Sequence, residues 1–282
     1  EPHALDALWA LDAIGGVGSV SMYPLLLNHT DPYVRRWAVK MAGDQPKPAD
    51  GATTLPPLSI WLQDIGKTEK HPEVRAQILA TAKRLPAETA LPLLWAGDTE
   101  DESGHLPLLA WWALESKAET ERAEVFAFLK SDPAFLKTTL FREHLAEKLA
   151  KRYALAGGEE NLQSCADLLA LTNDDTLRGK FIAGIASAFE GAEMPKLPES
   201  LTKALNDYMA KQSGGDLTLA LRSGSADALK SALKLLDDKK ASSTARIAIA
   251  KTLAELGKQE AVMTMVNILK ATNPPGLKRG IL

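Results

Sequence analysis

The stretch Asp31–Pro32–Tyr33–Val34–Arg35 predicts the start of a helix. An aspartate at the N-cap accepts hydrogen bonds from the free backbone N–H groups of the first turn. A proline fits the first helical position, where its missing N–H costs nothing. Val34 begins an apolar stripe with the spacing of one helical face, which continues at Trp37, Ala38 and Met41.

The same five-residue pattern returns at intervals typical of a helical repeat. A close copy begins at residue 71, and weaker copies begin at residues 138, 174 and 242, with steps of 40, 67, 36 and 68 residues. Two steps are single periods of about 35 to 40 residues, and two are double periods. Runs of alternating β-branched residues are missing from the sequence. We therefore predict an all-α fold, a right-handed α-α superhelix of the HEAT or armadillo kind.

We expect residues 1–282 to form one elongated domain, because each helix pair buries its second face only by stacking on the next pair. Segments rich in proline, glycine or acidic residues predict loops near residues 44–54, 97–104, 191–198 and 213–215. The most apolar segment, Leu106 to Leu114, predicts a central helix that is buried on two sides.

The composition argues against several classes of partner. The chain has 282 residues, 33 basic and 36 acidic, and a net charge of −3. It has no long block of Lys and Arg, so we expect no nucleic-acid partner. It also has no apolar run of the roughly 18 residues that a membrane helix needs, so we expect no direct membrane insertion.

Three segments carry a resemblance to a known family: His3 to Leu11, Val34 to Asp44, and Leu106 to Glu115. Together they resemble the helical middle region of the large haem-binding, membrane-bound-dehydrogenase-like proteins of planctomycetes and verrucomicrobia. In that family a β-propeller resembling sugar dehydrogenases precedes the helical region, and a cytochrome c domain with a Cys–x–x–Cys–His site follows it. The resemblance covers the first 115 residues, and residues 116–282 match only as generic HEAT-like helices.

The resemblance implies a scaffold between two functional domains of an exported or periplasmic protein. The chain contains no Cys–x–x–Cys–His sequence, so any haem c would belong to the parent protein. We predict no catalytic, cofactor-binding or metal-ligating residue here. The chain begins inside one helical pattern and ends just after a start signal at Pro274–Pro275. We therefore expect an internal fragment of a larger protein.

A few residues are candidates for contact with a partner or a ligand. Trp111 and Trp112 lie about 100° apart on their predicted helix, so they cannot share one face. One of them is the candidate for an exposed aromatic contact, while Trp37, Trp61 and Trp95 are expected in the core. His105 with Asp101 and Glu102 is a candidate metal-ligand set. The alternative is a solvated acidic loop, which we favour because no His-x₃-His spacing accompanies it.

Two further residue types have competing interpretations. Five arginines share the last position of the repeated pattern: Arg35, Arg75, Arg142, Arg178 and Arg246. We expect this position to form hydrogen bonds between repeats, with a phosphate-binding row as the alternative. The single cysteine, Cys165, lies in an apolar helical pattern. We expect it to be buried filler rather than a nucleophile.

The leading hypothesis is a non-catalytic interaction module within a larger redox protein, whose partners are neighbouring domains or another protein. The alternative is a freestanding, protein-binding HEAT solenoid. A remote alternative is a HEAT-like DNA glycosylase, which needs a basic groove with stacking aromatics. The acidic net charge argues against that enzyme class.

Overall fold

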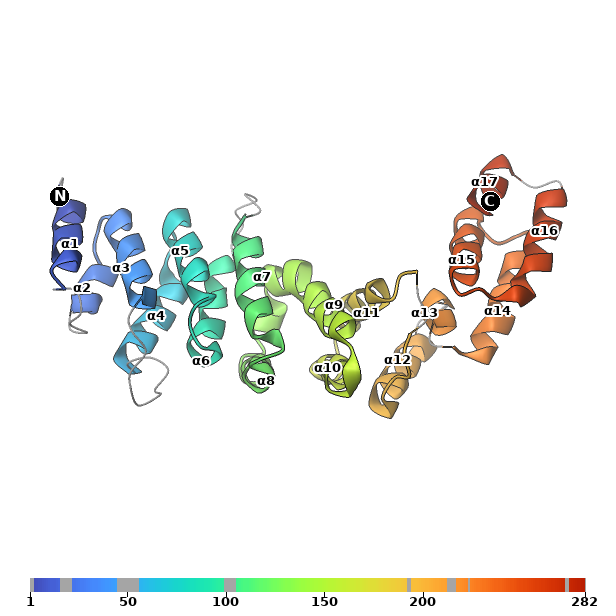
Figure 1. Cartoon of the computed structure of the whole chain (residues 1–282), viewed down its shortest axis with the longest axis horizontal. Coiled ribbons are helices and arrows are strands. Elements are labelled where there is room, and N and C mark those ends of the chain that lie inside the picture. The colour runs from blue at the N-terminus through green and yellow to red at the C-terminus, as the bar shows by residue number, and fades with distance from the viewer. Residues whose placement is uncertain are drawn as a thin grey trace. The chain divides into compact units, whose positions relative to one another are not determined.

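The computed structural model is all-helical, with 80% helix and no strand among the described residues (Figure 1). It describes residues 3–15, 22–44, 56–98, 105–191, 194–211, 217–222, 224–271 and 274–281. The predicted all-α class is confirmed. The predicted loop at 213–215 and most of those at 44–54 and 97–104 lie outside the described residues, whereas residues 194–198 form the expected non-helical connection.

The chain divides into two compact units, Glu1–Leu149 and Ala150–Leu282. The helices that begin in unit 1 are α1 (Ala4–Ala13), α2 (Tyr23–Leu27), α3 (Pro32–Asp44), α4 (Pro56–Thr68), α5 (Pro72–Ala82), α6 (Ala87–Ala90), η3 (Leu91–Gly97), α7 (His105–Ala118), α8 (Arg122–Ser131), η4 (Phe135–Lys137), η5 (Leu140–Leu145) and α9 (Ala146–Ala156).

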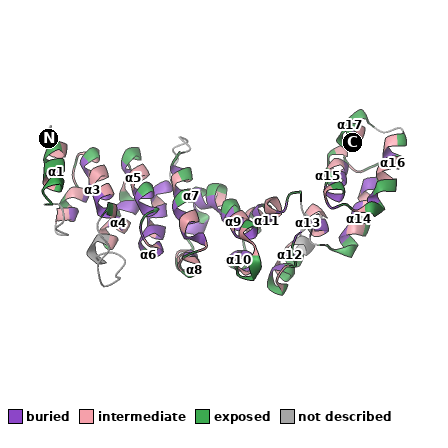
Figure 2. Ribbon diagram, viewed as in Figure 1, coloured by how far each residue is buried: buried purple, intermediate pink, exposed green. Residues whose placement is uncertain are grey.

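Helices of unit 1 pack in two rows. In one row α1 contacts α3, α3 contacts α5 and α5 contacts α7, and Figure 1 shows these four helices side by side. In the other row α2 contacts α4, α4 contacts α6 and α6 contacts α8. Figure 2 shows these helices with buried and exposed sides. A helix of either row is therefore covered partly by the neighbouring helix of the same row, which lies two helices away in the chain.

Side-chain caps begin several helices, as the repeated pattern predicts. Asp31 Oδ1 accepts a hydrogen bond from the backbone N–H of Tyr33 at 2.8 Å. Asp174 caps α11 (Asp175–Ala188), and Ser242 caps α15 (Ser243–Glu255). At the second copy, His71 occupies the N-cap position without a side-chain capping bond. The carboxylate of Glu69 instead accepts from the His71 backbone N–H at 2.8 Å.

A cluster of aromatic rings holds the later part of unit 1 together. Phe135 is fully buried, and its ring lies 5.6 Å from Trp95, 5.1 Å from Phe128 and 5.6 Å from Phe141. These residues belong to η3, α8, η4 and η5. One ring thus joins four segments, and the Trp95 indole N–H also donates to Asp132 at 2.9 Å.

Unit 2 continues with α10 (Gly158–Ala170), α11, α12 (Glu199–Lys211), α13 (Leu217–Arg222), α14 (Ala226–Asp237), α15, η6 (Gln259–Ala261), α16 (Val262–Lys270) and α17 (Pro275–Ile281). Gly157, the N-cap of α10, and Gly158, its first residue, have φ of 64° and 72°, values that favour glycine. Leu236, Leu253 and Leu277 are fully buried in one hydrophobic cluster. Within unit 2, α10 contacts α12, α13 contacts α15 and α15 contacts α17.

Three local features differ from the sequence prediction. The segment Pro86 to Trp95 is a short α-helix followed by the 3₁₀ helix η3. Pro92 lacks an N–H, so an α-helical hydrogen bond is lost there. The pattern at residue 138 begins the π-helical turn η5. Finally, α7 contacts α5, η3, α8 and η5 as a central helix should, but part of its apolar surface is uncovered, because Leu108 is 40% and Trp112 is 43% exposed.

Truncation of Phe135 to alanine is expected to lower the free energy of unfolding by about 3–5 kcal/mol, because it leaves a cavity among three rings. Urea denaturation followed by far-UV circular dichroism measures the change. Ile14→Ala is the control, since Ile14 is 80% exposed and a surface change costs within about 0.5 kcal/mol. Equal, small losses in both variants would contradict the central place of this ring.

Candidate functional site

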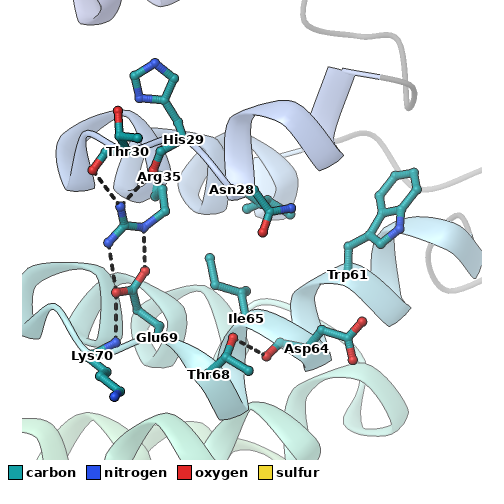
Figure 3. A pocket seen from close by; sticks show the side chains of 11 residues that line it. Asn28, His29, Thr30, Arg35, Trp61, Asp64, Ile65, Thr68, Glu69 and Lys70 are labelled. Atoms are coloured by element: carbon teal, nitrogen blue, oxygen red, sulfur yellow. Dashed lines mark hydrogen bonds and ion pairs between the residues drawn. The ribbon is translucent and has the colours of Figure 1, made fainter. Parts of the chain in front are cut away.

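The first arginine of the repeated position joins two helix pairs in unit 1 (Figure 3). Arg35 on α3 donates through Nε and Nη2 to the two carboxylate oxygens of Glu69, at 2.7 Å and 3.0 Å. Its Nη1 donates to the carbonyls of His29 and Thr30 at 2.8 Å and 3.1 Å. The guanidinium therefore ties the end of α2 to the segment that links α4 to α5.

The electrostatics of this pair favour the charged forms of both groups. Burial by itself would raise the pKa of Glu69, but hydrogen bonds from Arg35 and from the His71 and Lys70 N–H groups lower it below its usual range. The hydrogen bond to Glu69 raises the pKa of Arg35, against the lowering effect of its burial. A bidentate pair of this kind fixes geometry as well as charge.

Two other arginines of the repeated position donate hydrogen bonds to backbone carbonyls. Arg75 donates to the carbonyl of Ala96 at 2.6 Å and to that of Asp98. Arg246 Nε donates to the carbonyl of Leu236 at 2.9 Å. As expected for this position, the bonds of Arg35 and Arg75 reach the next helix pair, whereas the bond of Arg246 lies within one helix pair.

Arg222 was not recognised from the sequence as a member of this group. It donates to the carbonyl of Phe189 at 3.0 Å and pairs with the carboxylate of Glu255. That hydrogen bond is the main cause of a lowered pKa at Glu255, against the opposing effect of burial. Arg222 ends α13, so the helix-start pattern contained no signal that would find it.

Hydrogen bonds across one repeat period recur in both units. They join groups that are 33 to 42 residues apart in the chain. Besides the pairs of Arg35 and Arg222, they link Ala87 N–H with Glu121, Trp95 with Asp132, Thr81 with the Val39 carbonyl, Leu140 N–H with Asp98, and Ser200 with Gln163. The chain separation of these bonded groups thus agrees with the single steps of the sequence pattern.

A hollow of about 490 Å³ lies beside the Arg35–Glu69 pair, and Trp61, Asp64 and Lys70 contribute to its lining (Figure 3). The carboxylate of Glu69 already accepts from Arg35 and from two backbone N–H groups. The guanidinium of Arg35 is likewise engaged on four acceptor atoms. The Arg35–Glu69 pair beside the hollow is therefore engaged in holding helix pairs together.

Of the candidate metal-ligand set, only His105 lies within the described residues. His105 begins α7 with an exposed side chain, and Asp101 and Glu102 lie outside the described residues. Within the described residues no three His, Cys, Asp or Glu side chains are grouped so that they could hold a metal ion. Cys165 is buried as predicted, and burial raises the pKa of its thiol to about 12. This thiol is therefore protonated at neutral pH and a poor nucleophile.

The two adjacent tryptophans of α7 each contact a lysine. The Lys148 ammonium lies 5.9 Å from the centre of the Trp111 ring, which is half-buried. The Lys83 ammonium lies 5.8 Å from the centre of the Trp112 ring, which is 43% exposed. Of the two candidates, Trp112 presents the more accessible ring.

Trp112 lies at one end of a longer series of surface contacts in unit 1. At the other end the exposed Trp9 ring meets Trp37 edge-on, with centroids 5.4 Å apart. Lys40 lies 5.4 Å over the Trp37 ring and pairs with Asp44 at 2.7 Å. Asp44 also pairs with Arg84, which follows Lys83 in the chain. The sequence assigned Trp37 to the core and gave no sign that these side chains meet.

The carboxylate of Glu69 is expected to stabilise the fold in a pH-dependent way. Its folded pKa lies below the ordinary value of 4.5. The stabilisation is therefore complete above that value and is lost as the pH falls through the folded pKa. We expect Glu69→Gln to lower the free energy of unfolding by about 2 kcal/mol at neutral pH, and the difference from the wild type to shrink below about pH 4.5.

Urea denaturation over a series of pH values measures this difference. Glu73→Gln serves as the control, because Glu73 is 54% exposed and lies 3.6 Å from Arg36. An exposed pair contributes within about 1 kcal/mol. A Glu69→Gln penalty that stays constant from neutral pH to about pH 3 would show that the carboxylate charge is not what stabilises this junction.

No family model, curated protein or solved structure matches this chain. None of the described helices is both long and apolar enough to cross a lipid bilayer. The case for a function therefore rests on the contacts of the described residues and on the resemblance of the first 115 residues.

Proposed function

We propose that this chain is a non-catalytic helical-repeat scaffold and interaction module, built as a right-handed α-α superhelix of the HEAT or armadillo kind. The observation that carries the proposal is the set of hydrogen bonds that join groups 33 to 42 residues apart. In a stacked array each repeat contacts its neighbours, so long-range contacts cluster near one period. The packing of α1 on α3, α3 on α5 and α5 on α7 supports the same arrangement.

One ion pair departs from this spacing. Lys251 and Glu190 lie 3.4 Å apart across 61 residues. Their side chains are 63% and 66% exposed, and such exposed pairs contribute little to stability. The two ion pairs with the least exposed side chains, Arg35–Glu69 and Arg222–Glu255, keep to the single period. Bonds from Arg75 and Arg246 to backbone carbonyls span shorter separations.

We place the chain within a larger haem-binding, dehydrogenase-like protein, exported or periplasmic, on the strength of the resemblance in residues 3–115. A c-type haem does not fit this region, because Cys165 is the single cysteine and is buried. Any haem c would belong to another domain of the parent protein. The role left to this chain is to hold neighbouring domains, or a second protein, on its surface.

The gene on either side of the codons for Glu1 and Leu282 tests the parent protein. We expect a β-propeller pattern upstream and a Cys–x–x–Cys–His sequence downstream. A start codon directly before Glu1 and a stop codon directly after Leu282 would contradict the parent and leave a freestanding binding solenoid.

Cross-linking tests the interaction role. We expect benzoylphenylalanine in place of Trp112 to form a cross-link, in the natural full-length protein, to a neighbouring domain or a second polypeptide. Met263 in unit 2 is the control position, because it is 67% exposed and does not belong to α7. Absence of a specific cross-link at position 112 would argue against an interaction surface on α7.

A further inference from the structure

We propose that one surface strip of unit 1 binds an extended acidic peptide that carries an apolar residue near each end. The strip consists of Trp9, Trp37, Lys40, Asp44, Arg84, Lys83 and Trp112. The inference rests on the proposed interaction role, and it adds the chemical class of the partner.

The strip runs from α1 to α7. Direct contacts link Trp9 to Trp37, Trp37 to Lys40, and Lys40 and Arg84 to Asp44. Lys83, the chain neighbour of Arg84, then lies over Trp112. Neighbouring helices of this row are in contact. Each helix junction of the row therefore carries part of the strip on its surface.

The two ends of the strip are apolar and accessible. The Trp9 and Trp112 side chains are 42% and 43% exposed, and Leu108 beside Trp112 on α7 is 40% exposed. Tryptophan and arginine are enriched among the residues that carry the binding energy of protein interfaces. An exposed ring whose orientation is already fixed by contacts with neighbouring side chains also loses little conformational entropy on binding. The ends therefore suit apolar side chains of a peptide.

The middle of the strip is positively charged. Three of the strip's own residues are cations, Lys40, Arg84 and Lys83, and one is an anion, Asp44, which pairs with Lys40 and Arg84. The chain as a whole is acidic, with a net charge of −3, so this local excess of cations stands out. An ammonium group has three donors, and one over an indole ring keeps donors free for a carboxylate. The middle therefore suits acidic residues.

The length of the strip sets the length of the peptide. Three helix–helix steps separate α1 from α7, and packed helices lie about 8–10 Å apart, so the strip spans about 27 Å. An extended chain advances about 3.3 Å per residue. A peptide of about eight or nine residues therefore reaches from one end to the other.

A peptide fits better than a nucleic acid. Asp44 lies among the cations of the strip, and a carboxylate there would repel a continuous row of phosphates. Three cations are also few for a phosphate backbone, whose affinity depends on the number of neutralised phosphates. An acidic peptide can place an uncharged residue opposite Asp44.

Fluorescence anisotropy with a dye-labelled nonapeptide tests the proposal, using the whole chain at low ionic strength. The peptide carries leucine near both ends and glutamate or aspartate in the middle. We expect Lys83→Glu and Trp112→Ala each to weaken binding by about tenfold or more, which corresponds to about 1.4 kcal/mol. Added salt should also weaken binding, because the charges lie at the surface.

Matched controls separate the strip from general effects of charge and hydrophobicity. Lys230→Glu makes the same charge change at an 80% exposed lysine of unit 2, and Leu25→Ala removes a 74% exposed apolar side chain from α2. We expect both to bind as the wild type does. Lys83→Gln, which removes the charge without reversing it, is expected to weaken binding less than Lys83→Glu, and circular dichroism checks that each variant is folded.

Several results would overturn the inference: no binding, equal binding of a peptide with glutamine and asparagine in its middle, unchanged binding by the strip variants, or tighter binding of a single-stranded DNA oligonucleotide. These failures are distinguishable from failure of the proposed function. If position 112 cross-links to a partner while the acidic peptide does not bind, the interaction role stands and the acidic partner is wrong.

Discussion

The structure depends on a constraint of helix pairs: a pair of amphipathic helices buries one face internally and needs a neighbour to cover the other. Polar groups at the junctions must then find partners in the next pair. The Arg35–Glu69 pair meets this need at one junction, because its guanidinium also binds carbonyls at the end of α2. Arg222 meets it in unit 2, on Glu255 and the Phe189 carbonyl.

Much of this fold is predictable from short-range signals. Proline at the first turn and Asp or Ser at the cap act within a few residues, so the starts of α3, α11 and α15 could be read from sequence. Recurrence of the arginine in the same pattern also predicted a junction role for Arg35 and Arg75. The helix starts share one property, which is that their physical cause lies within a single turn of helix, whereas the arginine role was inferred from its recurrence at the same position of the pattern.

Features that depend on tertiary neighbours were missed. Arg222 has its role because Phe189 and Glu255, each 33 residues away, lie beside it. The Trp9–Trp37 contact joins α1 to α3, and the partial exposure of Trp112 on an apolar helix depends on which neighbours pack against α7. Hydrophobic composition indicates that a helix is buried somewhere, but it does not say which ring is left at the surface.

The arrangement separates two kinds of polar group in unit 1. The carboxylate of Glu69 accepts hydrogen bonds from Arg35 and from two backbone N–H groups, which suits a structural role. The tryptophan and lysine side chains of the strip contact each other at the surface and remain accessible. The proposed scaffold role needs both kinds: an interior whose hydrogen bonds fix the spacing of the helices, and an outer face whose groups can exchange water for a partner.

The central claim is that each helix pair is stabilised mainly by its contacts with the adjacent helix pairs. Hydrogen exchange with mass spectrometry tests it directly on the Leu79→Ala variant, which opens a cavity at a fully buried position of α5. The account predicts faster exchange in α3, α5 and α7 and unchanged exchange in α13 to α17. A uniform rise along the whole chain would contradict it, because it would show that the chain unfolds as one globular body.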